Sequence, residues 1–225
     1  MTLHIGILLF PAVQQLDLTG PYEVFASLPD AKVHLVASSL DLVTSATGLI
    51  LIPTVTFADC PDLDVLCIPG GAGVNALLRD QVTLDFVRRQ AAVAQYVTSV
   101  CTGALVLGAA GLLRGKRATT HWASHDLLSV FGAIPVCERV VRDGNLVTGG
   151  GVTAGIDFAL RLAGELVGQP TAEAVQLFLE YAPAPPFNAG TPETAPPAVL
   201  EMVRTRSAKM RAEREALAAE LGSSC

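Results

Sequence analysis

The sequence has few charged residues, and it lacks the basic excess that nucleic acids attract. Only 16% of the 225 residues are charged, against about 25% in an average soluble domain. Lys and Arg number 15 and Asp and Glu number 21, which leaves a net charge of −6. A chain with 51% apolar residues is not disordered. The acidic balance argues against a nucleic-acid partner.

The sequence also lacks a convincing membrane or export segment. Residues 90–113 carry no charge and are long enough to span a bilayer. Glutamine, threonine, serine and glycine interrupt this stretch, so a buried strand followed by a buried helix explains it better. No basic segment precedes the first apolar run, as one would in a signal peptide. We therefore expect a soluble, cytoplasmic protein without a membrane partner.

The cysteines lack the spacing of a metal site or of a redox pair. They are Cys60, Cys67, Cys101, Cys137 and Cys225. None forms a CxxC motif, and the four histidines do not cluster with them, so we expect no bound metal. Free thiols are the default without an export signal. Cys67 and Cys137 are predicted to lie in strands as core residues, whereas Cys60 lies in a loop and Cys225 ends the chain.

Short apolar runs alternate with helical patterns along most of the chain. The predicted strands are 3–10, 33–38, 63–68 and 95–100, and the predicted helices are 21–28, 82–94, 102–113 and 153–167. Continuous apolar runs are typical of strands that are covered on both faces of a parallel sheet. Asp143-Gly144 predicts a hairpin between 137–142 and 145–148. The alternation predicts an α/β fold, a three-layer sandwich.

The character of the sequence changes near residue 182. Residues 182–197 are rich in proline and are not expected to form regular structure. Residues 198–221 predict a charged helix. We expect an α/β domain over 1–182 and, over 183–225, a proline-rich segment with a helix. That helix packs either on the body of its own chain or on a dimer partner. Its basic and acidic residues alternate, which is typical of a solvated face.

Cys101 lies where a predicted strand ends and a predicted helix begins. Small residues surround it in the run Ser99-Val100-Cys101-Thr102-Gly103. This context is typical of a nucleophile elbow, in which a strained turn lifts one side chain above the sheet. The amides at a helix N-terminus lower the pKa of a thiol, so we expect a reactive Cys101. The alternative is a buried structural cysteine.

Other candidate site residues follow strand ends, which meet at one edge of a parallel sheet. Gly70 and Gly71 follow the strand at 63–68, and their N–H groups either face a bound oxyanion or form a tight turn. Gly150, in a second glycine run, is a weaker candidate of the same kind. Asp17 is either the N-cap of the helix at 21–28, a role that Thr19 could also take, or an acid beside Cys101.

His121 follows Cys101 by twenty residues, after a short strand candidate at 118–120. It is either a base for Cys101 or a histidine at the rim of the core. Trp122, Ile156 and the loop at 149–155 are candidates for the wall of an apolar pocket.

Three runs together resemble the ThiJ/PfpI superfamily. They are LDLTGPYEVF at 16–25, CIPGGAG at 67–73 and VCTGALVLGAAGLLRGKRATTHW at 100–122. The resemblance covers residues 2 to about 182. It implies a flavodoxin-like, mostly parallel sheet with a cysteine at the nucleophile elbow, and a homodimer.

Details of the motifs narrow the resemblance. Thr102 stands where superfamily proteases have histidine, and no His-x-Glu triad follows Cys101. Asp17 stands where deglycase-like members have glutamate. This combination resembles the members that add water to isonitriles, a hydro-lyase reaction that gives N-substituted formamides.

That resemblance implies a reaction without metal or organic cofactor on a small-molecule isonitrile. Cys101 would form a covalent thioimidate, Asp17 would act as acid and base, and Thr102 would orient water or substrate. Gly70, Gly71, Gly150 and His121 would surround the substrate or its oxyanion. The alternatives are another cysteine enzyme of the superfamily, similar to glyoxalases and deglycases, or a non-catalytic redox or ligand sensor.

Overall fold

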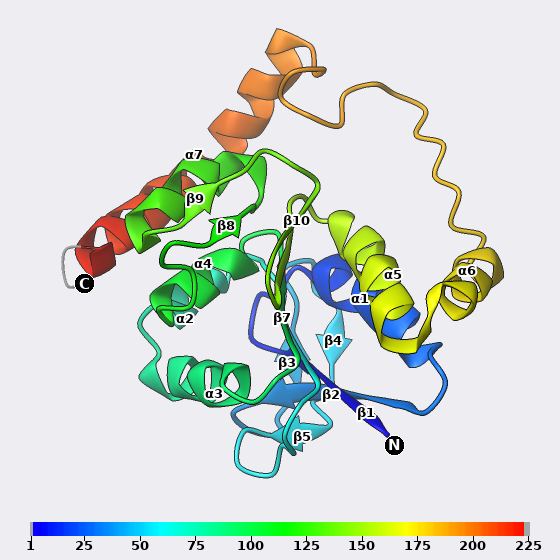
Figure 1. The fold of residues 1–225 in the computed structure, drawn as a ribbon. Coiled ribbons are helices and arrows are strands. Elements are labelled where there is room, and N and C mark those ends of the chain that lie inside the picture. Colours follow the sequence, from blue (N-terminus) through cyan, green and yellow to red (C-terminus); the bar gives the residue numbers. More distant parts are fainter. Residues whose placement is uncertain (1, 223–225) are drawn as a thin grey trace.

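A seven-stranded sheet forms the centre of the molecule (Figure 1). The computed structural model describes residues 2–222. The strand order is β10-β11-β7-β6-β1-β2-β5, and every pair is parallel except β10 with β11. The strands are β1 (Leu3–Leu8), β2 (Ala31–Ala37), β5 (Val55–Thr56), β6 (Val65–Ile68), β7 (Tyr96–Val100), β10 (Val140–Asp143) and β11 (Leu146–Gly149). The mostly parallel sheet predicted from the apolar runs is confirmed.

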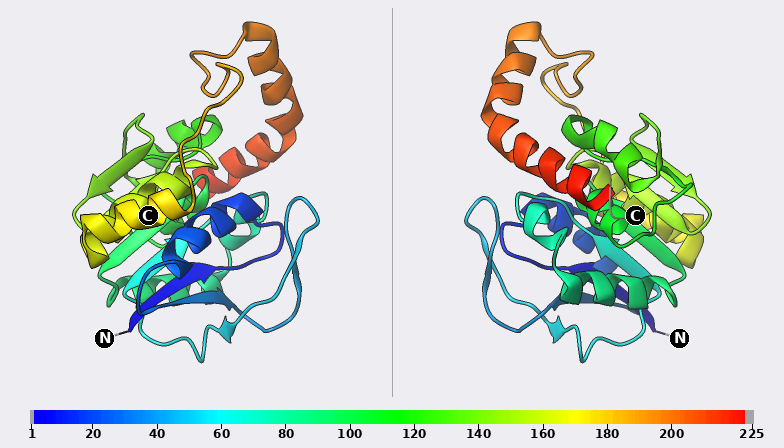
Figure 2. Two further views of the ribbon diagram at one scale, coloured as in Figure 1. Left: turned by 90° about the vertical axis from the view of Figure 1, so that its right-hand side faces the viewer. Right: turned by 90° about the vertical axis from the view of Figure 1, so that its left-hand side faces the viewer.

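Helices cover both faces of this sheet, which confirms the three-layer sandwich (Figures 1 and 2). One face carries α1 (Gln15–Ala26) and α5 (Ala154–Val167), with α6 (Gln169–Phe178) packed on α5. The other carries α2 (Val74–Leu77), α3 (Gln81–Ala91) and α4 (Gly103–Ala109). Every residue of β6 and β7 is buried. This burial on both faces is why their sequences are continuous apolar runs rather than alternating ones.

Several short elements were not predicted. They are β3 (Val43–Thr44), β4 (Ile50–Leu51), β9 (Ile134–Pro135), the 3-10 helix η1 (Trp122–Phe131) and the helices α2 and α6. β8 (Arg117–Ala118) takes the place of the strand candidate at 118–120 and pairs with β9. Two-residue strands are too short to show a hydrophobic period, so only long-range pairing reveals them.

The first helix begins earlier than the sequence indicates. α1 starts at Gln15, and Asp17 lies in its first turn rather than in a loop. The N-cap residue is Gln14, so the predicted capping role of Asp17 or Thr19 is wrong. Pro21 lies inside the helix, although proline favours the first turn. The buried packing of α1 against α5 compensates for the lost backbone hydrogen bond.

The predicted hairpin is present, but it is shorter than expected. β10 and β11 join through Gly144, whose φ of 64° suits the turn. The ladder ends at the pair Val140 and Gly149, so Cys137 lies outside the strand and is exposed. The prediction of Cys137 as a core residue is therefore wrong. Cys67 is buried in β6 as predicted, Cys60 is half-buried, and Cys225 lies outside the described residues.

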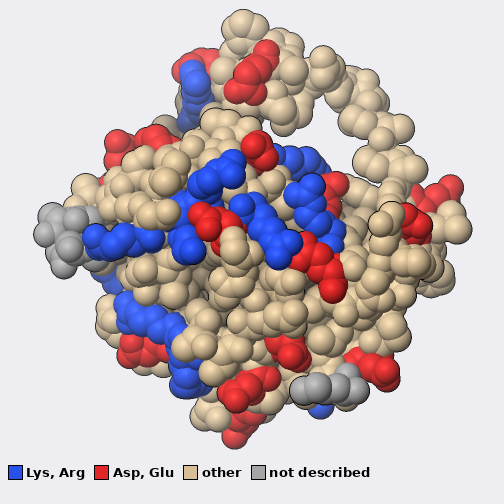
Figure 3. Space-filling model, in the orientation of Figure 1, with Lys and Arg blue, Asp and Glu red and all other residues tan. Residues whose placement is uncertain are grey.

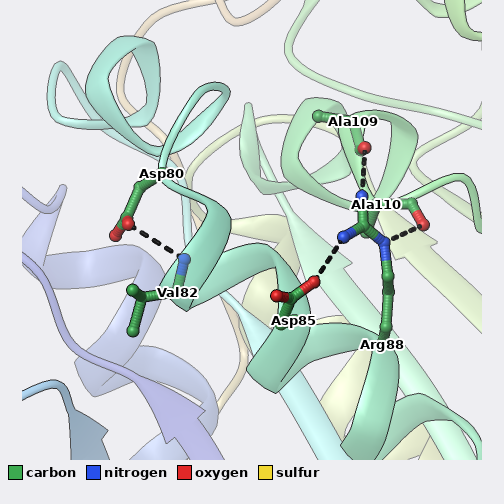
Figure 4. A network of polar contacts seen from close by, with 6 residues as sticks. All are labelled: Asp80, Val82, Asp85, Arg88, Ala109 and Ala110. Carbon is green, nitrogen blue, oxygen red and sulfur yellow. Dashed lines mark hydrogen bonds and ion pairs between the residues drawn. The ribbon is translucent and has the colours of Figure 1, made fainter.

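An arginine of α3 holds the end of α4 (Figure 4). Asp80 caps α3 by accepting a hydrogen bond from the Val82 N–H at 3.2 Å. Arg88 donates to the carbonyl oxygens of Ala109 and Ala110, at 3.3 and 3.1 Å, and pairs with Asp85 at 2.7 Å. A cation at a helix C-terminus satisfies free carbonyls and complements the helix dipole. The contact fixes α4, whose N-terminus carries Cys101.

The helix α7 (Pro197–Gly222) reaches back over the body of the chain after an irregular segment (Figure 2). Its C-terminal half contacts η1 and α2, and Ala218 is fully buried there. Its N-terminal half leans outward and exposes Val199 and Met202. Among residues 2–222, no helix is long and apolar enough to cross a membrane. Most of the face in Figure 3 is uncharged, and basic and acidic side chains alternate on it.

Candidate active site

Cys101 has the geometry of a nucleophile elbow. It lies between β7 and α4 with φ at +54°, a region that non-glycine residues rarely adopt. The Cys101 N–H donates to the Gly149 carbonyl at 3.0 Å, and its own carbonyl accepts from the Thr120 hydroxyl at 2.6 Å. Hydrogen bonds on both sides of the turn hold this strained backbone. The residue is only 6% exposed, so access to its thiol comes through a cavity.

Asp17 is a fully buried carboxyl beside this thiol. Its Oδ2 accepts a hydrogen bond from the Gly70 N–H at 2.9 Å. Its Oδ1 is buried without a partner at normal hydrogen-bond distance among residues 2–222, and the Cys101 thiol interacts with the carboxyl more weakly. Burial raises the pKa of Asp17 from 3.8 to about 7, against the lowering effect of Gly70 and Cys101.

Burial opposes ionisation of the Cys101 thiol. Burial raises the pKa of Cys101 well above its ordinary value, and the negative charge of Asp17 raises it further. Hydrogen bonds from Thr102 lower this pKa but do not outweigh burial. The expectation of a lowered thiol pKa is therefore wrong, because burial outweighs the helix N-terminus. Of the two groups, Asp17 is therefore the one whose pKa lies near neutrality, at about 7.

Glycine at position 70 lets the acid and the elbow meet. A Cβ atom there would lie 2.5 Å from the Thr102 nitrogen and 2.8 Å from Oδ2 of Asp17. The next residue, Gly71, donates its N–H to the Thr102 hydroxyl oxygen at 3.1 Å. This N–H is therefore engaged within the protein, whereas the sequence left open whether it faces an oxyanion or forms a tight turn. Because the Thr102 hydroxyl accepts from Gly71, its own proton is free to turn toward the Cys101 sulfur.

His121 lines the cavity as a neutral hydrogen-bond donor. Its Nδ1 accepts from the Ala123 N–H at 3.3 Å, which places the proton of the neutral ring on Nε2. Burial lowers the pKa of His121, and the positive charge of Arg214 lowers it further. This arrangement favours donation to a ligand over proton abstraction from Cys101. Gly150 lies away from the cavity wall, and its N–H donates to the Arg139 carbonyl at 2.9 Å.

A cavity of about 670 Å³ opens onto the thiol. Gly71, Cys101, Thr102 and His121 line it. Of the residues predicted to form an apolar wall, Trp122 lines the cavity, and so does Val152, which belongs to the loop at 149–155. Ile156 does not line it. Within residues 2–222, no cluster of three or more His, Cys, Asp or Glu side chains could hold a metal ion.

Helix α7 forms part of this cavity, which was not predicted from the sequence. Six of its residues line the wall: Val203, Arg206, Ser207, Met210, Arg211 and Arg214. Arg214 is only 3% exposed. It donates to Asn75 Oδ1 at 2.8 Å, to the Ser124 hydroxyl at 3.2 Å and to the Gly71 carbonyl at 3.2 Å. These positions recur every three or four residues, so they lie on one face of the helix, and this spacing could have indicated a buried face. It was not recognised because arginines are normally solvated.

The comparisons with known proteins agree with this architecture. The chain is 70% identical over 216 residues to an isonitrile hydratase from Pseudomonas putida, which covers 95% of each chain. A crystal structure of a ThiJ/PfpI family protein from Pseudomonas syringae superposes with a TM-score of 0.94 at 50% identity, over 97% of this chain and 91% of that one.

A more distant relative is named for a different activity. The glutathione-independent glyoxalase DJR-1.2 of Caenorhabditis elegans is 27% identical over 139 residues, 61% of this chain and 74% of that protein. The model of the DJ-1/PfpI family matches residues 4–165. The chain therefore belongs to the DJ-1/PfpI family.

Proposed function

We propose that this protein is an isonitrile hydratase, a hydro-lyase that converts R–N≡C and water into the N-substituted formamide. The observation that carries the proposal is the fully buried Asp17 carboxyl beside the Cys101 thiol at the nucleophile elbow, where burial raises the pKa of Asp17 to about 7. The identity of 70% to the Pseudomonas putida isonitrile hydratase, over nearly the whole of both chains, supports the same reaction. Hydration needs a nucleophile and an acid at one carbon, and the pair supplies both.

In the first step, the Cys101 sulfur attacks the terminal carbon of the isonitrile. The proton held by the pair passes to that carbon by way of Asp17, so that the product is the neutral thioimidate R–N=CH–S–Cys101. The N–H of Thr102 donates to the sulfur and stabilises its developing charge. Transfer of the proton in the same step avoids a separated thiolate, which burial disfavours.

In the second step, water attacks the same carbon. The Asp17 carboxylate removes a proton from the water and passes it to the imine nitrogen, which leaves Asp17 as a carboxylate again. The tetrahedral intermediate R–NH–CH(OH)–S–Cys101 then forms the formamide carbonyl and expels the sulfur. Asp17 returns the hydroxyl proton to Cys101, which restores the starting pair. We assign the Nε2–H of His121 and the hydroxyl of Thr102 to orienting the substrate or water.

Formamide release from cyclohexyl isocyanide tests this reaction. We expect steady turnover by the wild type, and a loss of at least about a thousandfold in both Cys101→Ala and Asp17→Asn. Cys137→Ala is the matched control, because Cys137 is an exposed thiol outside the cavity. Acid quenching during turnover should trap a species heavier by the mass of one isonitrile, located on Cys101.

The results that would contradict this proposal can be told apart. If the Cys101→Ala variant turned over substrate at the wild-type rate, the covalent route would be ruled out. Failure of the wild type to form formamide, with a thiol that still reacts with iodoacetamide, would overturn the proposal. Activity on methylglyoxal would then favour a glyoxalase, and selective oxidation of Cys101 without turnover would favour a sensor.

We also propose that the protein acts in the cytoplasm as a homodimer. The described cysteines are free thiols, as is usual in a reducing compartment. Exposed apolar side chains around β3 and β4, among them Leu42, Ile50 and Ile52, supply a surface of the kind that dimers bury. Sedimentation velocity at micromolar concentration should give about twice the chain mass of 23.4 kDa. A monomer under these conditions would contradict the dimer.

A further inference from the structure

We propose that the cavity selects isonitriles whose substituent carries an anionic group such as a carboxylate, and that Arg206 and Arg211 of α7 recognise that group. This inference rests on the proposed function and specifies its substrate class. The residues that line the cavity include three arginines and neither aspartate nor glutamate. The chain as a whole has a net charge of −6, so this cationic wall is a local exception. Such a wall attracts an anionic substrate.

The three arginines differ in how their charges are balanced. Arg214, the most buried, donates to three neutral oxygens, and its guanidinium supports the loop at Gly71. Arg211 is half-buried and pairs with Asp126 at 2.5 Å through Nη2. Arg206 is exposed and has no hydrogen-bond or ion-pair partner among residues 2–222. The wall thus keeps uncompensated positive charge, and Arg206 is the guanidinium free to bind a ligand.

The chemistry of attack directs the substituent of the isonitrile away from Cys101. The isonitrile carbon is terminal and the R–N≡C group is linear, so the substituent lies beyond the nitrogen, in the remaining volume of the cavity. That volume, about 670 Å³ in total, suits a substituent much larger than the reacting group. Apolar side chains, including Trp122, Val203 and Met210, line the cavity together with the arginines. The wall therefore fits an apolar chain that ends in an anion.

Paired substrates test this selectivity. The probes are straight-chain isocyano carboxylates of several lengths and their methyl esters, compared by kcat/KM for formamide release. We expect the wild type to prefer the acid over the ester at the best chain length. Arg206→Gln should lower the acid-to-ester ratio about fivefold, mainly through KM, since an exposed ion pair contributes up to about 1 kcal/mol. Arg206→Glu should lower the ratio further.

Two more variants sharpen the test. Arg204→Gln is the matched control, because Arg204 is exposed on the same helix and does not line the cavity, only the hollow beside it. It should leave the ratio unchanged. Asp126→Asn removes the carboxylate that neutralises Arg211, so it should raise the ratio. Added salt should weaken the preference for the acid and leave turnover of the ester unaffected.

The outcomes separate this inference from the proposed function. Equal use of acid and ester, or the same ratio in Arg206→Gln and Arg204→Gln, would overturn the anionic selectivity and leave isonitrile hydration intact. A wild type that hydrates neither probe nor cyclohexyl isocyanide would overturn both.

Discussion

The Arg214 guanidinium donates a hydrogen bond to the Gly71 carbonyl at 3.2 Å and joins the C-terminal helix to the loop beside Cys101. The Gly71 N–H in turn donates to the Thr102 hydroxyl, which contacts the sulfur of Cys101. Helix α7 is therefore connected to the nucleophile through one peptide and one hydroxyl, although 143 residues separate Arg214 from Gly71. This connection makes α7 part of the site rather than an appended tail.

Arg214→Lys should reduce kcat while the protein stays folded. A lysine ammonium keeps the charge, but it lacks the planar fork that bonds Asn75, Ser124 and Gly71 together. We expect a loss of about 1–3 kcal/mol in unfolding free energy from the acceptors left without a donor, and a fall in kcat larger than any change in KM. Urea unfolding and steady-state kinetics measure the two effects. The exposed Arg204→Lys should change neither, and wild-type kcat in Arg214→Lys would contradict the connection.

Gly70→Ala should abolish activity. Its methyl group would overlap the Thr102 nitrogen and the Asp17 carboxylate, at 2.5 and 2.8 Å, and would push the acid away from the thiol. We expect kcat/KM to fall by at least about a hundredfold, as a displacement of about 1 Å can do. Gly151→Ala is the control, because nothing lies within 4 Å of a Cβ atom there. If Gly70→Ala retained most of the wild-type activity, the close approach of Asp17 and Thr102 to Gly70 would not matter for the reaction.

The contribution of Asp17 to stability should fall as pH rises through the range in which Asp17 ionises. The pKa of Asp17 is about 7 in the folded chain, against 3.8 for a free aspartate side chain, so the folded state holds this proton between these limits. This contribution to the unfolding free energy therefore decreases from about pH 4 to pH 7 and levels off above, while the lowered pKa of His121 acts in the opposite direction. A difference of about three pKa units sets an upper bound of roughly 4 kcal/mol on this loss.

Asp17→Asn should remove this dependence, because asparagine does not ionise. Urea unfolding at pH 5 and pH 8 should show a smaller difference for Asp17→Asn than for the wild type, with the variant gaining stability at pH 8. The exposed Asp41→Asn is the control and should follow the wild type. A difference between pH 5 and pH 8 that is the same in the wild type and in Asp17→Asn would contradict the raised pKa.

Local patterns carried most of the information about the fold. Continuous apolar runs identified the central strands because burial on both faces leaves no alternation. The strand, cysteine and helix around Cys101 identified the elbow, since that turn is made by neighbouring residues. Pro21 misled the prediction of the first helix, because local propensity gave way to packing between α1 and α5. Cys137 was misplaced because only the pairing of β10 with β11 decides where the hairpin ends.

The sequence by itself determined the α/β architecture, the elbow at Cys101 and the presence of Asp17, Gly70 and Gly71 at one edge of the sheet. These features follow from hydrophobic period, turn chemistry and the shared direction of parallel strands. Only the tertiary structure decided that burial raises the pKa of the Cys101 thiol, that the Gly71 N–H donates to the Thr102 hydroxyl, and that Arg214 is buried in the cavity wall. Such properties depend on desolvation and on contacts between distant segments, which helical or strand periodicity does not encode.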